Sequence, residues 1–128
     1  MSVIEYNHME GEYMDLLKII KALSHQNRLR ILNLIKQQDL CVCELEYIMD
    51  VNQSNASRHL TKLKEAEIIY GKRKAQWVYY QINKRLLDKH KFLKEIVDNE
   101  LKNIELVNED NKKLKKYINS NLSCEDLT

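Results

Sequence analysis

The feature that most restricts the fold of this chain is a change of hydrophobic period in its middle third. Before the change, apolar residues recur every three or four positions in two short segments, about 41–49 and 53–66, separated by DVN. This spacing predicts two helices joined by a tight turn, with Asn52 as the N-cap of the second. After it, β-branched and aromatic residues flank a basic cluster, which predicts antiparallel strands at about 67–72 and 76–82.

The rest of the chain has helical spacing. Apolar stripes predict helices at about 11–23, 25–37 and 84–107. In the C-terminal tail at about 109–128, we expect a last helix at 109–119 and a frayed end, NSNLSCEDLT. The stripe at 84–107 is too long for the core of one subunit to cover, so we expect it to form a dimer interface with helix 11–23.

The chain has 128 residues, two Gly, no Pro and no linker composition. These features predict one domain, 1–128, that is mainly α with a small β-hairpin. Its helix-turn-helix is expected at about 41–66 and its wing at about 67–82, in a homodimer.

Positive charge is concentrated in this central region. Residues 52–85 contain eight Lys/Arg and two Asp/Glu, although the whole chain has a net charge of only +2. The second predicted helix directs Ala56, Leu60 and Leu63 inward, and its opposite face carries donors and no acid. The predicted DNA-contacting residues are Gln53, Ser54, Asn55, Ser57, Arg58, His59, Thr61 and Lys62 of the helix and Lys72, Arg73, Lys74 and Gln76 of the hairpin.

Any exposed helix face is polar, but helix spacing, a face of one charge sign and a basic hairpin coincide here. Together they favour double-stranded DNA as the partner. For His59, which lies on the flank of the helix, DNA contact and a hydrogen bond that closes the core both remain open.

Two cysteines, Cys41 and Cys43, stand one residue apart in DLCVCEL, where a helix is predicted to begin. Positions i and i+2 of a helix point about 200° apart, so one ion can bind both sulfurs only if the helix start unwinds. Thiolates select soft ions, and such a distortion would disturb the neighbouring DNA-reading helix. Core filling and a thiol redox switch are the alternatives.

No signal pattern or membrane-length apolar run is present, so a cytoplasmic protein without a membrane partner is expected. Cytoplasmic thiols stay reduced, which makes a structural disulfide the weaker interpretation. The sequence has no Cys-x-x-Cys motif, Gly-rich phosphate loop or acid–base constellation, so an enzyme with a small-molecule substrate is not expected. An interaction module without DNA binding is a further alternative.

Four segments, ALSHQNRLRIL, DLCVCEL, NQSNASRHLTKLKEAEII and KAQWVYYQI, closely resemble the ArsR/SmtB family of winged-helix metalloregulators. The resemblance runs from about residue 15 to residue 85. It implies a homodimer that represses an operator and is released when a metal binds. The C-V-C box resembles that of the arsenite-responsive and the cadmium/lead-responsive branches. It therefore implies As(III) or Sb(III) as inducer, with Cd(II) or Pb(II) as the alternative and no organic cofactor.

The resemblance is incomplete at the metal site. Where the arsenite branch often has a third cysteine, this chain has Glu46, and the segment 1–12, from which the cadmium/lead branch draws cysteines, has none. That absence favours arsenite or antimonite, which accept few thiolates. The remaining thiol, Cys124, is a candidate third ligand beside Cys41 and Cys43, from the same or the partner subunit.

Two further departures concern a second metal site and the backbone. Asp88 and His90 match half of a site on the final helix of some members, but Leu101 and Ile104 occupy the positions of the other half, so we expect no zinc there. Members usually have Gly at the positions of Glu67 and Ala75. Positive φ at these positions would cost a non-glycine residue roughly 1 kcal/mol, which predicts a different hairpin turn.

Overall fold

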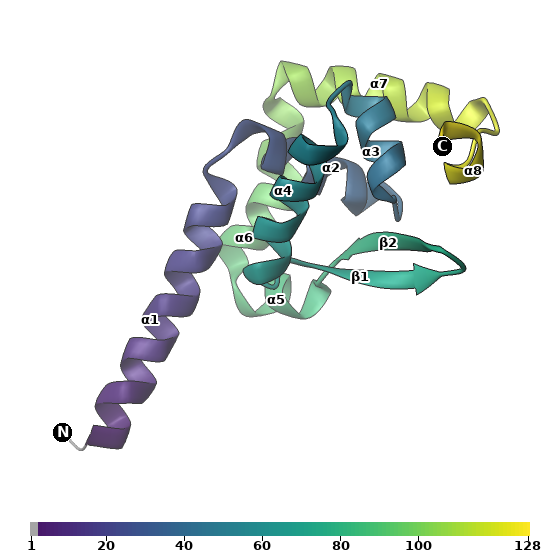
Figure 1. The fold of residues 1–128 in the computed structure, drawn as a ribbon. Coiled ribbons are helices and arrows are strands. Elements are labelled where there is room, and N and C mark those ends of the chain that lie inside the picture. The colour runs from purple at the N-terminus through teal and green to yellow at the C-terminus, as the bar shows by residue number, and fades with distance from the viewer. Residues whose placement is uncertain (1–2) are drawn as a thin grey trace.

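The structure, a computed structural model, describes the backbone of residues 3–128 and the side chains from residue 13 onward. The order of elements is α1 (Val3–Leu23), α2 (Gln26–Gln37), α3 (Val42–Met49), α4 (Gln53–Glu65), β1 (Ile69–Lys74), β2 (Trp77–Ile82), α5 (Lys84–Lys89), α6 (Lys91–Glu95), η1 (Ile96–Glu100), η2 (Leu101–Asn103), α7 (Glu105–Asn119) and α8 (Cys124–Leu127). The predicted fold class, mainly α with a two-stranded antiparallel hairpin, is confirmed. Figure 1 shows α1 extending away from the other helices and the hairpin projecting beside α3 and α4.

The α3–turn–α4 unit forms as the sequence predicts. Asp50 has a φ of 56° and ends α3, and the side chain of Asn52 accepts a hydrogen bond of 2.8 Å from the Asn55 N–H. The inner faces of both helices, with Leu45 and Leu60, are buried in the core that they share with α2. The N-terminal end of α4 therefore has a fixed position on the rest of the molecule.

The hairpin begins two residues later than predicted, and Lys74 pairs with Trp77 across a two-residue turn. Leu40, just before α3, pairs with Tyr80, whose N–H donates to its carbonyl at 2.9 Å. Glu67 and Ala75 have φ values of 62° and 58°. Both non-glycine residues thus adopt the left-handed conformation that glycine favours, at a cost of roughly 1 kcal/mol each.

The predicted continuous helix at 84–107 is wrong, because the chain becomes extended at His90 and again at Ile104. A straight helix would place Leu87 and Leu93, six residues apart, about 120° from each other around its axis. The extended conformation of His90 changes the rotation of α6 relative to α5, so that both leucines are buried. Core packing therefore breaks the helix without a proline or glycine.

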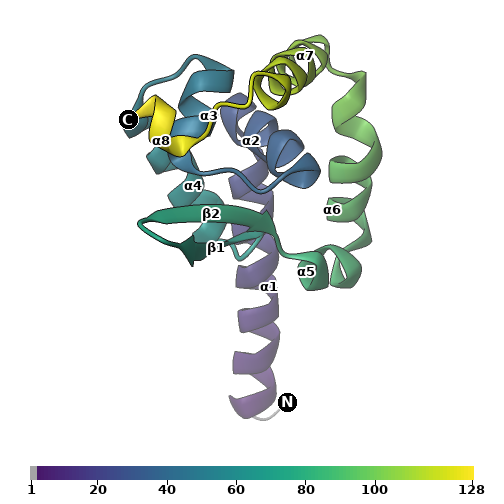
Figure 2. The same ribbon diagram turned by 90° about the vertical axis from the view of Figure 1, so that its right-hand side faces the viewer.

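The last helix expected at 109–119 forms as part of α7, but the end that follows it is not frayed as predicted. Helix α7 buries Val107, Asp110, Leu114 and Tyr117, and a short turn leads from it to α8. This stripe packs on α2 and α3, so α7 lies across the top of the molecule in Figure 1, and Figure 2 shows α8 beside α3.

Helix α1 is longer than predicted and apolar on two sides. Ile19 and Ala22 are buried against the core, whereas Tyr13 and Ile20 on other faces are 64% and 48% exposed. In the described part of the chain, the helices lack the length or apolarity needed to cross a membrane.

Candidate functional site

The outward face of α4 carries most of the side chains predicted to contact DNA. Gln53, Ser54, Arg58, Thr61 and Lys62 are exposed. Asn55 and Ser57 are partly buried, and the Asn55 side chain faces α2, where it accepts a hydrogen bond from Asn27. Thr61 donates its hydroxyl hydrogen to the Ser57 carbonyl at 2.9 Å, so that hydroxyl is already engaged within the helix.

At the hairpin, the structure exposes all four predicted contact residues, Lys72, Arg73, Lys74 and Gln76. The three cations lie on β1 immediately before the turn. Among the described ion pairs, none neutralises them. They therefore present uncompensated positive charge that suits phosphate contacts.

His59 does not belong to this exposed face. Its side chain is 1% exposed and its ring lies 4.2 Å from the ring of His25. The alternative of a core hydrogen bond is not realised either, since neither ring nitrogen has a hydrogen-bond partner among the described residues. Burial, His25 and the nearby cations Arg28 and Arg58 lower the pKa of His59 to about 4, so the ring is neutral at pH 7. His59 was wrongly predicted to contact DNA because its flank of the helix is covered by His25, the N-cap of α2.

The sulfur atoms lie at the opposite end of the helix-turn-helix. Cys41 is the extended N-cap of α3 rather than its first helical residue, and it is buried. The sulfur of Cys124, at the start of α8, is bonded to that of Cys41 in a disulfide across 83 residues of sequence. The structure thus joins two of the three predicted ligands within one subunit, and the expectation of reduced thiols is not met.

Cys43 is a free thiol on the first turn of α3 and is partly buried. Burial and the charges of Glu46 and Glu44 raise its pKa, so it holds its proton more tightly than an exposed thiol. Cys41 and Cys43 therefore do not both lie on a regular helix, as the sequence predicted, because Cys41 is outside it. An ion shared by all three sulfurs must instead draw Cys43 toward the buried pair.

Glu44 and Tyr117 complete the surroundings of the disulfide. The Glu44 carboxylate accepts the Cys41 N–H at 3.0 Å and the hydroxyl hydrogen of Tyr117. One ligand atom each from Cys41, Glu44 and Cys124 lies within 4.8 Å of the other two, and all three residues are buried. Burial and the hydrogen bond to Glu44 raise the pKa of Tyr117 well above its usual value, so the phenol stays protonated.

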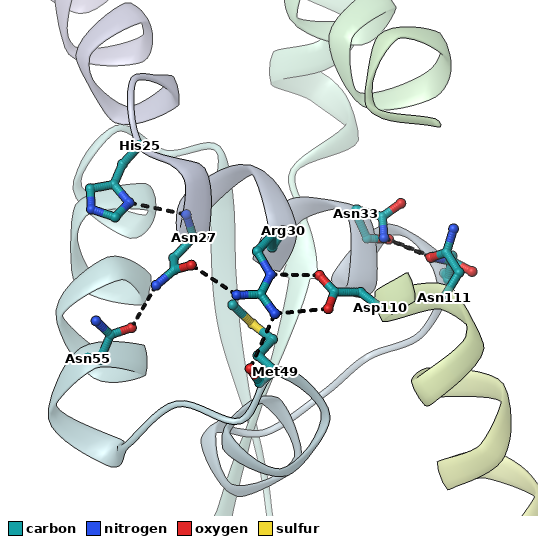
Figure 3. A network of polar contacts seen from close by, with 9 residues as sticks. His25, Asn27, Arg30, Asn33, Met49, Asn55, Asp110 and Asn111 are labelled. Atoms are coloured by element: carbon teal, nitrogen blue, oxygen red, sulfur yellow. Dashed lines mark hydrogen bonds and ion pairs between the residues drawn. The ribbon is translucent and has the colours of Figure 1, made fainter. Parts of the chain in front are cut away.

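A second polar network connects α7 with α4 (Figure 3). Arg30 of α2 forms two hydrogen bonds, of 2.8 and 2.9 Å, with the fully buried Asp110 of α7. The same guanidinium donates to the Met49 carbonyl at the end of α3 and to the Asn27 side chain. Asn27 in turn donates to the Asn55 side chain at 3.1 Å. Helix α7 therefore contacts α3 near the sulfurs and reaches α4 through Arg30.

The half-site at Asp88 and His90 has other partners. Asp88 lies 3.6 Å from the ammonium of Lys94 at the surface, and the His90 ring packs edge-on against Phe92. That these two residues form a solvated or interfacial pair and not a zinc site stays a prediction.

Sequence reasoning missed Arg30, Glu44, Asp110 and Tyr117. One signal was available: Val107, Leu114 and Tyr117 share a helical stripe that includes Asp110, and an acid inside an apolar stripe indicates a buried partner. The sequence pattern did not indicate that the partner is Arg30, because Arg30 lies 80 residues from Asp110 in the sequence.

A capped helix-turn-helix with an exposed polar face and a basic hairpin beside it defines a winged-helix DNA-binding regulator. A homodimeric winged helix-turn-helix DNA-binding domain from Mycobacterium bovis has this fold, with a TM-score of 0.61 at 22% identity over 82% of this chain and 94% of that one. At this identity the likeness shows the fold alone.

The sequence comparisons are more specific. The model of the bacterial regulatory protein arsR family matches residues 25–70. The arsenic resistance transcriptional regulator ArsR1 of Pseudomonas putida is 42% identical over 66 residues, 51% of this chain and 52% of that protein. The transcriptional repressor SdpR of Bacillus subtilis is 35% identical over 54% of this chain and 77% of that protein.

This chain therefore belongs to the ArsR family, whose matched members are transcriptional regulators and not enzymes. The match spans about half the length of ArsR1. Helices α7 and α8, with Asp110, Tyr117 and Cys124, lie beyond the residues that the family model matches.

Proposed function

We propose that this protein is a cytoplasmic repressor that binds double-stranded operator DNA as a homodimer and releases it when As(III) or Sb(III) binds Cys41, Cys43 and Cys124. The observation that carries the proposal is the position of the sulfurs. Two of them meet at the N-cap of α3, and α3 leads through a three-residue turn into the DNA-reading helix α4. A change at the sulfurs is thus one short helix away from the DNA-contacting face.

The switch follows from a difference between two states of the first turn of α3. Three thiolates in a pyramidal arrangement require the Cys43 sulfur to leave its place on the helix and approach the buried Cys41 and Cys124. The Cys41 N–H and the Tyr117 hydroxyl both depend on Glu44 in this turn, so its movement disturbs the contact of α7 with α3. The inducer binds the distorted state better and shifts the population away from the DNA-competent one.

Binding to DNA is expected to use the exposed residues of α4 and the three cations of β1 in each subunit. Two copies related by a twofold axis would present two reading helices to successive major grooves. The exposed apolar residues Tyr13 and Ile20 of α1 support pairing through this helix, because a helix that is apolar on two sides needs a second covering surface.

The test uses reduced protein and a duplex selected from a random-sequence pool. Arsenite should release wild-type protein from the duplex, whereas Cys41→Ser and Cys43→Ser should bind the duplex normally and stay bound. Asn119→Ser, an exposed change on α7, is the matched control and should be released like wild type. Release of the double variant Cys41→Ser/Cys43→Ser by arsenite would refute the proposed sensor.

The disulfide favours a second candidate, a thiol redox response. Peroxide would oxidise the thiols of Cys41 and Cys124 to the disulfide, with the peroxide reduced to two waters. The disulfide links α8 covalently to the N-cap of α3, and reduction would remove this link. Equal DNA affinities of the oxidised and reduced proteins would exclude this candidate. A titration that compares Cd(II) and Pb(II) with arsenite separates the remaining alternative inducers.

A further inference from the structure

We propose that Glu44, together with Cys41 and Cys124 of the same subunit, forms a two-sulfur, one-oxygen site for a thiophilic divalent cation such as Cd(II). The inference rests on the proposed function in its use of the two cysteines and adds a carboxylate ligand that the C-V-C spacing does not indicate. Its first support is geometric: these three residues have ligand atoms within 4.8 Å of one another. In the described part of the chain, Cys43 is not a member of this group.

The second support is the electrostatic situation of Glu44. Its side chain is 5% exposed, and among the described residues no lysine, arginine or histidine forms an ion pair with it. A buried carboxylate is costly unless a cation or several donors compensate it. It has two protein donors, the Cys41 N–H and the Tyr117 hydroxyl, and a carboxylate has about four lone-pair positions. Glu44 therefore retains capacity for a cation beside the two sulfurs.

The surrounding charges favour a cation over a neutral guest. Glu44 lies in the first turn of α3, and Glu125 and Asp126 lie in the first turn of α8, the two helices whose N-terminal ends carry the sulfurs. These carboxylates produce a negative potential around the site. Such a potential attracts a divalent cation and offers nothing to arsenous acid, which is uncharged at neutral pH.

Ligand preference also separates divalent cations from As(III). Thiolates with a carboxylate suit borderline-soft divalent ions, whereas As(III) bonds to thiolates. A dithiol reductant first converts the Cys41–Cys124 disulfide to two thiols and is itself oxidised to a disulfide. The two thiols then bind the cation and release their two protons as the metal–sulfur bonds form. Cys43 is then the third ligand of As(III), and Glu44 is the third ligand of the divalent ion. The sulfurs of Cys41 and Cys124 are ligands of both.

Tyr117 acts on this site as a positioning residue. Its hydroxyl holds one Glu44 oxygen, and the Cys41 N–H holds the other, so the carboxylate plane is fixed before the ion arrives. Outer hydrogen bonds of this kind typically contribute 10–100-fold to metal affinity.

The experiment titrates fully reduced full-length protein with Cd(II) and, separately, with arsenite. Glu44→Gln should weaken Cd(II) binding at least about tenfold and leave arsenite binding within about twofold. Glu46→Gln, a partly exposed acid on the same helix, is the matched control and should change neither. Cys43→Ser should abolish tight arsenite binding and leave Cd(II) binding unchanged. Unchanged Cd(II) affinity in Glu44→Gln would overturn the proposal.

A measurement on the wild-type protein keeps the test independent of variant folding. X-ray absorption at the cadmium edge should show two sulfur neighbours with oxygen completing the shell. Three sulfurs would place Cys43 in the site instead of Glu44 and refute the inference. That result would leave the proposed repressor intact, whereas arsenite release without Cys41 and Cys43 would refute the repressor and not the Cd(II) site.

Discussion

Single residues hold the C-terminal half of the molecule to the half that contains the helix-turn-helix. The Arg30–Asp110 pair is the clearest example, because its two hydrogen bonds span α2 and α7 and both side chains are removed from water. The hydrogen bond and charge of Asp110 raise the pKa of Arg30 against the effect of burial, so the guanidinium remains charged. Removal of one partner from such a pair leaves an uncompensated buried charge.

We therefore expect Asp110→Ala to lower the free energy of unfolding by about 3–5 kcal/mol in urea denaturation. Glu109→Ala, which removes an exposed acid from the adjacent position, should change it by no more than about 0.5 kcal/mol. A loss below about 1 kcal/mol in Asp110→Ala would show that the pair does not anchor α7.

Protonation of His59 makes the free energy of unfolding depend on pH, and the lowered pKa of His59 fixes the sign of this dependence. Its pKa in the folded protein is about 4, below the unfolded value of about 6.5, so unfolding takes up a proton between these pH values. Its contribution to stability is complete above pH 6.5 and is lost as the pH falls toward 4. From pH 7.5 to pH 5 the loss should be about 2 kcal/mol. Urea unfolding of wild type and His59→Gln at both pH values measures it, and parallel pH profiles would contradict it.

Among the elements, α8 depends most on a single covalent bond. The Cys41–Cys124 disulfide joins residues 83 positions apart and so reduces the conformational freedom of the unfolded chain. This effect stabilises the folded protein by about 2–4 kcal/mol. A phosphine reductant should therefore lower the free energy of unfolding of the oxidised protein by that amount. Cys124→Ser should be indifferent to the reductant. If reductant leaves the wild-type protein unchanged, α8 does not contribute through its disulfide.

The elements also show where sequence reasoning succeeds and where it ends. The α3–α4 turn was predictable because Asn52 and the apolar spacing are local signals. The break at His90 was not, because no local breaker marks it and it serves the burial of Leu87 and Leu93. The approach of Cys124 to Cys41 depends on α7, whose docking needs Arg30 from the other end of the chain. Such distant partners leave no periodic signal.

At the scale of the whole molecule, charge separates the proposed DNA-binding surface from the sulfur site. The β1 cations lie on the exposed hairpin, whereas acids surround the start of α3. Phosphate contacts release counterions, so the slope of log affinity against log salt concentration is about −0.9 times the number of phosphates contacted.

Lys72→Ala and Lys74→Ala should each weaken DNA binding and reduce this slope by about 1. Lys115→Ala, an exposed change on α7, is the charge-matched control and should leave both unchanged. Fluorescence anisotropy with a labelled duplex over a range of salt concentrations gives the slopes. Equal slopes for the three variants would show that the hairpin does not contact the backbone.

The central claim is that inducer and operator compete through the conformation of α3. Thermodynamic linkage requires that if arsenite weakens DNA binding, DNA weakens arsenite binding by the same factor. The most direct measurement is the affinity of the reduced protein for arsenite, with and without saturating selected duplex. We predict weaker arsenite binding in the DNA complex, by the factor that arsenite imposes on DNA affinity. Equal arsenite affinities in the two states would contradict the account.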